Sequence, residues 1–63
     1  MKDLKIAMER LQDELDGLYE YEEGIKYVED PKLKDLLKNI HNVEKSHATA
    51  LLNYINEYAK AVL

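Results

Sequence analysis

The chain has 63 residues and a formal net charge of −4 at pH 7, and it contains no cysteine. A chain of this length forms one small domain that buries only about 60% of its unfolded surface, so we expect it to self-associate. The acidic balance argues against nucleic-acid binding, which needs a basic face, and the lack of cysteine excludes disulfides and thiolate metal sites.

Composition also indicates the fold class and the compartment. Two glycines, one proline and many Leu, Ala, Glu and Lys residues are typical of an all-α protein. No apolar run approaches the ~20 residues that cross a bilayer, and the start of the chain does not resemble a secretory signal. We therefore expect a cytoplasmic protein that does not bind a membrane.

From about residue 2 to about residue 29, hydrophobic residues recur at steps of three and four, which predicts a long amphipathic helix. Its apolar stripe is Leu4, Ala7, Leu11, Glu14, Leu18, Tyr21, Ile25 and Val28. Glu14 is the one charged member of this stripe. Gly17 and Gly24 each cost roughly 1 kcal/mol relative to alanine inside a helix, which indicates either close approach of another helix or a mild bend.

The dipeptide Asp30-Pro31 predicts a turn at about residues 29–31, because proline ends one helix and suits the first position of the next. A second helix is then expected from residue 31 to about residue 61. Its predicted stripe is Leu33, Leu37, Ile40, Glu44, His47, Leu51, Tyr54, Tyr58 and Ala61. Two long helices joined by a tight turn form an antiparallel hairpin.

Glu44 and His47 form an E-x-x-H motif within the second stripe. Residues three apart share a helix face, so both side chains can bind one ion from the same side. In an antiparallel hairpin that turns near residue 30, Glu14 is level with both of them. Glu22 and Glu23 lie two turns or more from the motif and are weaker candidates, and we interpret His41 as a surface histidine beside the stripe.

One hairpin offers two carboxylates and one imidazole, which is too few for a closed metal site. Two hairpins related by a two-fold axis would combine two copies each of Glu14, Glu44 and His47 in a four-helix bundle. This is the ligand set of di-iron and di-manganese carboxylate proteins. The oxygen-rich set favours iron or manganese, with Zn²⁺ possible but redox-inert, and two bridged Fe²⁺ ions would support ferroxidase chemistry.

Residues 11–53 resemble the encapsulated ferritins, half-length ferritin-like proteins that store iron inside encapsulin shells. The resemblance rests on D-E-L-D at Asp13 to Asp16, Tyr21, D-P-K-L at Asp30 to Leu33 and V-E-K-S-H-A at Val43 to Ala48. It also rests on the thirty residues that separate Glu14 from Glu44.

The resemblance implies a ferroxidase at a dimer interface, with Glu14, Glu44 and His47 of each chain as iron ligands. It implies a ring of five such dimers and an encapsulin shell protein as partner. It also places Tyr21 near the metal centre and assigns Asp13 and Asp16 to the route by which metal arrives.

Three functions remain open from the sequence. The first is the ferroxidase, and the second is a di-metal peroxidase of the rubrerythrin kind, although no cysteine-ligated electron-transfer centre is present. The third is a structural helical module in which Glu14, Glu44 and His47 specify register and partner instead of binding metal. For Tyr21, Tyr54 and Tyr58 we favour simple packing of the stripe.

Overall fold

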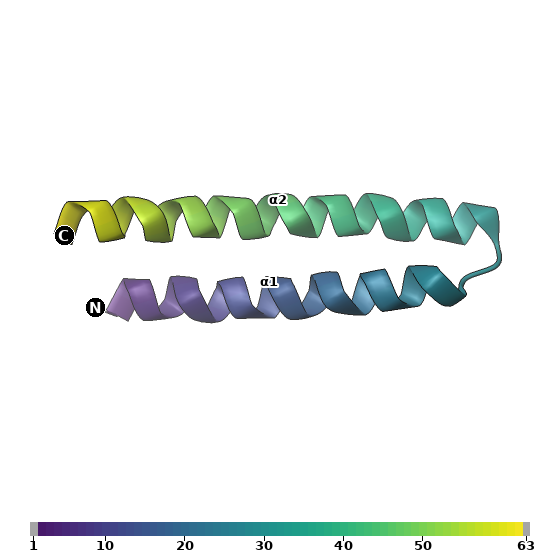
Figure 1. Cartoon of the computed structure of the whole chain (residues 1–63), viewed down its shortest axis with the longest axis horizontal. Coiled ribbons are helices and arrows are strands. Elements are labelled where there is room, and N and C mark those ends of the chain that lie inside the picture. The colour runs from purple at the N-terminus through teal and green to yellow at the C-terminus, as the bar shows by residue number, and fades with distance from the viewer. Residues whose placement is uncertain (1, 63) are drawn as a thin grey trace.

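The computed structural model describes residues 2–62, with side chains described for residues 2–61. It contains two α-helices, α1 (Lys2–Tyr27) and α2 (Pro31–Val62), which run antiparallel along one another (Figure 1). The predicted all-α hairpin is therefore confirmed. Helix α1 ends two residues earlier than predicted, and α2 extends one residue further.

The turn is organised by Asp30, which caps α2. The backbone N–H of Lys32 donates to Asp30 Oδ1 at 3.1 Å, and the backbone N–H of Lys34 donates to the Asp30 carbonyl at 2.9 Å. Pro31 is the first helical residue, where its missing N–H costs no hydrogen bond. Because a residue before proline is disfavoured in the α conformation, Asp30 is kept out of both helices, and the reversal occupies Val28 to Asp30.

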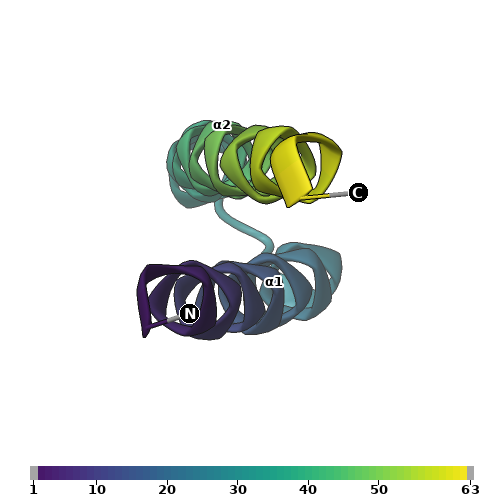
Figure 2. The same ribbon diagram turned by 90° about the vertical axis from the view of Figure 1, so that its left-hand side faces the viewer.

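The hairpin is long and thin, and it has one seam instead of a layered core. Its Cα positions span 48 × 14 × 13 Å, and the view from the end that carries the termini shows one helix stacked on the other (Figure 2). Ala7 and Ala48, which are 7% and 8% exposed, are the buried hydrophobic residues of the described part. Small side chains at these points let the two helices approach closely.

The seam on α1 follows the predicted stripe, but the seam on α2 is shifted from it. Leu37, Ile40, Glu44, Leu51 and Tyr58 are half-buried as predicted. Four predicted members, Leu33, His47, Tyr54 and Ala61, are exposed, and the buried Ala48 and half-buried Ile55 face α1 in place of His47 and Tyr54. The prediction was wrong here because the apolar face of α2 is wider than one seam, so periodicity alone allowed both choices.

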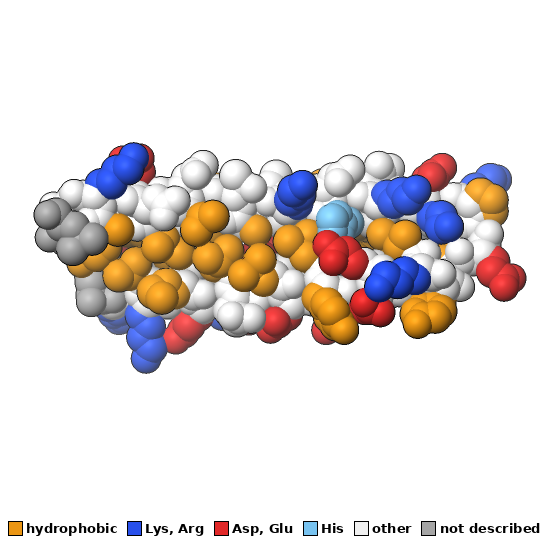
Figure 3. All heavy atoms as spheres, in the orientation of Figure 1, with side chains coloured by type: hydrophobic (Ala, Val, Ile, Leu, Met, Phe, Trp, Pro, Cys, Tyr) orange, Lys and Arg blue, Asp and Glu red, His pale blue; other side chains and the backbone are white. Residues whose placement is uncertain are grey.

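Much hydrophobic surface stays uncovered in the single hairpin. Figure 3 shows one side of the molecule, where hydrophobic side chains form a band along the line between α1 and α2. Large hydrophobic residues that are more than two-fifths exposed occur on both helices: Ile6, Met8, Leu15, Tyr19, Tyr27, Leu33, Leu36, Val43, Leu52 and Tyr54. Within the described residues, neither helix has an apolar stretch of the length that crosses a membrane.

Candidate metal centre

The structure brings Glu14, Glu44 and His47 together at mid-height of the hairpin. Glu14 comes from the middle of α1, and Glu44 and His47 come from adjacent turns of α2. One ligand atom from each of the three side chains lies within 4.8 Å of the others, a spacing that a single metal ion can bridge. The role of these residues as ligands stays a prediction, whereas their convergence is an observation.

Glu14 is the inner member of this cluster. Its side chain is 23% exposed, and its Oε1 lies 3.5 Å from Nδ1 of His47, whose side chain is 54% exposed. The other oxygen, Glu14 Oε2, is buried and has no hydrogen-bond partner. A buried carboxylate oxygen without a partner is costly, and a cation would satisfy it.

The pKa of Glu44 is raised above its ordinary value of 4.5. The first cause is a hydrogen bond with the Glu14 side chain, which favours the protonated form of Glu44. Burial and the negative charge of Glu14 act in the same direction, whereas His47 acts against them. The two carboxylates are therefore held close enough to compete for one positive charge, whether a proton or a metal ion.

The remaining residues predicted for the site lie outside this cluster. Asp13 forms an ion pair with Arg10 at 3.0 Å, and Asp16 accepts a hydrogen bond from the Gln12 amide at 2.9 Å. Both acids are exposed. Tyr21 is half-buried and lies two helical turns closer to the turn than Glu14.

A second histidine–carboxylate pair was missed by the sequence analysis. His41 Nε2 lies 3.0 Å from Oε1 of Glu22 on the facing helix, and the His41 side chain is only 20% exposed. The interpretation of His41 as a surface histidine is therefore wrong. The pair lies about two helical turns from the Glu14–His47 pair, and it depends on which side of α2 faces α1, which the hydrophobic periodicity of α2 does not decide.

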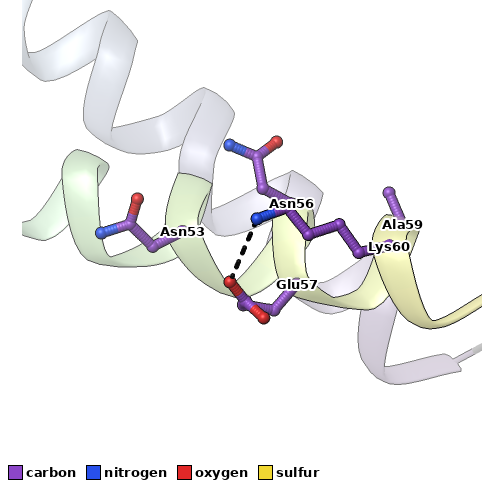
Figure 4. Close-up of a pocket in the computed structure, with 5 residues that line it drawn as sticks. All are labelled: Asn53, Asn56, Glu57, Ala59 and Lys60. Carbon is purple, nitrogen blue, oxygen red and sulfur yellow. Dashed lines mark ion pairs between the residues drawn. The ribbon is translucent and has the colours of Figure 1, made fainter.

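A concave area of the described surface lies on α2 near its C-terminal end and is lined by Asn53, Asn56, Glu57, Ala59 and Lys60 (Figure 4). All five residues come from one helix, and the Glu57–Lys60 ion pair, at 3.7 Å, is largely solvated. The side chains in Figure 4 point in different directions instead of into a common cavity. This area offers no ligand-binding constellation.

Comparisons with known proteins do not assign the chain to a group. A scan against protein families, a search of curated proteins and a search of solved structures each found no match.

The donor set is chemically suited to a metal ion but incomplete in one hairpin. Glu14 and Glu44 supply two carboxylates and His47 supplies one imidazole, and the His47 side chain is exposed to solvent. Iron and manganese take mainly oxygen and nitrogen ligands in higher coordination numbers, so these three side chains would leave coordination positions open for water or further donors.

Proposed function

We propose that two copies of this chain form a four-helix bundle and oxidise Fe²⁺ with O₂ at a shared site. The observation that supports this most directly is the convergence of Glu14, Glu44 and His47 within 4.8 Å. Glu14 Oε2, which is buried without a hydrogen-bond partner, supports it further, because a cation would satisfy this oxygen. Iron is the substrate in this proposal.

Charge balance explains why the paired site would take two divalent ions. Two hairpins contribute four carboxylates, from Glu14 and Glu44, and two imidazoles, from His47. Without cations the carboxylates repel one another and lose solvation. In the single chain the pKa of Glu44 is raised first by its hydrogen bond with Glu14, and then by burial and by the negative charge of Glu14. Two divalent ions neutralise all four charges, so metal binding should strengthen the dimer.

The chemistry of the donors favours iron as the substrate. A ligand set of four carboxylates with one imidazole per ion suits Fe²⁺ and Mn²⁺, and Zn²⁺ would bind without redox activity. Two Fe²⁺ ions each give one electron to O₂, which takes up two protons and leaves as H₂O₂, with two Fe³⁺ ions as the other product. Glu14, Glu44 and His47 would hold the two ions close enough for both to donate to one O₂ molecule.

The sequence resemblance adds three features to this proposal: iron storage or detoxification, a ring of dimers, and an encapsulin shell. The same resemblance assigns Asp13 and Asp16 to the route by which iron arrives and places Tyr21 near the centre. The support that comes from the structure is the cluster of Glu14, Glu44 and His47.

A metal-free function has one specific observation in its favour. The His47–Glu14 contact at 3.5 Å and a proton shared between Glu14 and Glu44 would satisfy much of the cluster without any ion. In that case the cluster would fix the register of a helical interaction module.

Anaerobic titration with Fe²⁺ followed by exposure to air separates the two functions. The wild type should bind about two Fe²⁺ per two chains and consume about one O₂ per two Fe²⁺. Glu14→Gln and His47→Ala should each lose most of this binding. Glu22→Gln and His41→Ala are matched controls, because they remove the same groups from the other cross-helix pair and should keep wild-type uptake.

Unchanged iron binding in Glu14→Gln and His47→Ala would reject the site. Iron binding without O₂ consumption would reject the ferroxidase and leave a structural metal site. Absence of binding in the wild type would favour the interaction module.

A further inference from the structure

Hydrophobic residues continue past the candidate metal centre along one side of α2. Leu33, Ile40, His47 and Tyr54 follow one another at intervals of seven residues, which is two helical turns, so they lie on one side of α2. We call the side of the hairpin that carries them the site face. Leu33 and Tyr54 are 43% and 46% exposed, so α1 leaves the two ends of this stripe uncovered, whereas Ile40 between them is half-buried.

A groove opens on the site face between the metal cluster and the turn. It has a volume of about 270 Å³ and is lined by Glu20, Tyr21, Gly24 and Leu37. A Cβ atom placed on Gly24 would have no neighbour within 4 Å, and neither glycine has a positive φ. The hairpin itself therefore does not require glycine at this position, although the helix is weakened by it.

The register of the hairpin relates this groove to Tyr54. Gly24 follows Glu14 by ten residues, and Tyr54 follows Glu44 by ten residues along the opposite chain direction. Leu37 and Tyr54 lie at equal distances on the two sides of the midpoint between Glu44 and His47, each seven residues from the nearer and ten residues from the farther of the two. The groove and Tyr54 are thus equally distant from the metal cluster, the groove toward the turn and Tyr54 toward the chain ends.

A two-fold axis that passes through the metal cluster and is perpendicular to the helices would place Tyr54 of one copy level with the groove of the other copy. We infer that a second copy of this chain packs antiparallel on the site face, α2 against α2, and inserts its Tyr54 into the groove at Gly24. Each of the two grooves then receives one tyrosine. This inference rests on the proposed function, because the axis is placed through Glu14, Glu44 and His47.

The distribution of charge favours the antiparallel copy over a parallel one. On the site face, the middle of α1 carries Arg10, Asp13 and Glu20, with the exposed Ile6 and Tyr27 at the same seven-residue spacing toward its ends, whereas α2 carries the hydrophobic stripe. A copy with its turn at the same end would place the polar side of α1 on the hydrophobic stripe of α2. The antiparallel copy joins the two stripes and brings Arg10, four residues before Glu14, to within two residues in height of the partner's Glu20, which is six residues after Glu14 and has the opposite charge.

Tyrosine suits the groove chemically. Its ring would cover the apolar surface of Leu37 and Tyr21, and the missing side chain of Gly24 leaves room for it. Buried tyrosine hydroxyls need a hydrogen-bond acceptor, and the Glu20 carboxylate at the groove offers one. The contact would therefore specify both the orientation and the register of the dimer.

Disulfide trapping tests the contact directly, because the chain has no cysteine of its own. The single variants Gly24→Cys and Tyr54→Cys are refolded together, oxidised, and analysed by non-reducing electrophoresis, with and without redox-inert Zn²⁺. The mixture should yield covalent dimer as its main product. Each variant alone should stay monomeric on the gel, because two copies of either residue would lie about 25–30 Å apart along the helices, beyond the ~7 Å limit for a disulfide.

Leu52→Cys is the matched control for Tyr54→Cys. Leu52 is also an exposed hydrophobic residue of α2, at 47% exposure, but it precedes Tyr54 by two residues, so it lies about 160° away around the helix and off the site face. Its mixture with Gly24→Cys should give no covalent dimer. Equal trapping in this control, trapping of Gly24→Cys with itself, or no trapping in the Gly24→Cys and Tyr54→Cys mixture would each overturn the inference.

Gly24→Leu provides a second measurement without cysteine. The new side chain has open space in the hairpin but would occupy the groove, so helix content should be kept while the dimer dissociation constant rises at least tenfold. An unchanged dissociation constant would reject the contact. Wild-type iron oxidation is independent of these results, so oxidation without trapping rejects only the interface, and trapping without oxidation rejects only the ferroxidase.

Discussion

His47 Nδ1 lies 3.5 Å from Oε1 of Glu14, across the two helices of the hairpin, and Glu44 lies one helical turn before His47 on the same side. Of these three residues, the two carboxylates lie in the seam and the imidazole lies at its edge, half in solvent. The cluster therefore joins the interior of one hairpin to the surface on which a second hairpin would pack. Its protonation and its occupancy by metal should consequently affect both stability and assembly.

Raising the pH should destabilise the metal-free protein. The folded-state pKa of Glu44 is raised above 4.5, so the folded chain binds more protons than the unfolded chain between that pH and the folded-state pKa. The contribution of Glu44 to the free energy of unfolding is then greatest below about pH 4.5. It is lost as the pH rises through the folded-state pKa of Glu44. Urea unfolding at a series of pH values checks this, with Glu44→Gln expected to remove the dependence; an unchanged pH profile in that variant would contradict it.

Chelation should weaken the protein and its dimer together. If metal binds only the folded dimer, a free concentration of one hundred times the dissociation constant stabilises it by about 2.7 kcal/mol. Adding a chelator should lower the melting temperature and shift sedimentation toward the monomer. The same addition to Glu14→Gln should change neither quantity, and a comparable response of that variant would place the metal elsewhere.

Enlarging Ala48 should force the helices apart next to the metal cluster. Ala48 is 8% exposed and directly follows His47, so Ala48→Leu should cost about 1–3 kcal/mol of unfolding free energy through overpacking. Ala50→Leu is the control, because Ala50 is exposed and should tolerate the change within about 0.5 kcal/mol. Chemical denaturation measures both, and equal effects would mean that α1 and α2 do not meet at Ala48.

Removing the cap of α2 should destabilise the turn. Asp30 Oδ1 accepts a hydrogen bond from the N–H of Lys32, so Asp30→Ala should cost about 1 kcal/mol. Asp35→Ala removes the same charge from an exposed position beyond the cap and should cost less. The comparison is made by thermal unfolding followed by circular dichroism, and it fails if the two variants melt alike.

The Glu22–His41 pair should contribute to the hairpin without contributing to iron binding. Its atoms lie 3.0 Å apart, but Glu22 is 57% exposed, so a double-mutant cycle with Glu22→Gln and His41→Ala should give a coupling of about 0.2–1 kcal/mol. Fe²⁺ uptake by both single variants should match the wild type. A loss of uptake would extend the metal site toward the turn.

Both helices, the turn at Asp30-Pro31 and the convergence of Glu14 with Glu44 and His47 followed from the sequence by itself. Each depends on local physics: the three-and-four spacing of hydrophobic residues, the restriction that proline places on its neighbours, and the constant rise of a helix that makes residues equidistant from a turn level. The three polar residues were detectable because they interrupt otherwise hydrophobic stripes.

Only the tertiary structure decided which side of α2 meets α1. The hydrophobic face of α2 is wide enough for two adjacent seams, and packing selected the small Ala48 with Ile55 and left His47 and Tyr54 exposed. Helix rotation of this kind depends on side-chain volumes on both partners, which periodicity in one helix does not contain. The same rotation placed His41 against Glu22, turning a presumed surface histidine into a contact between the helices.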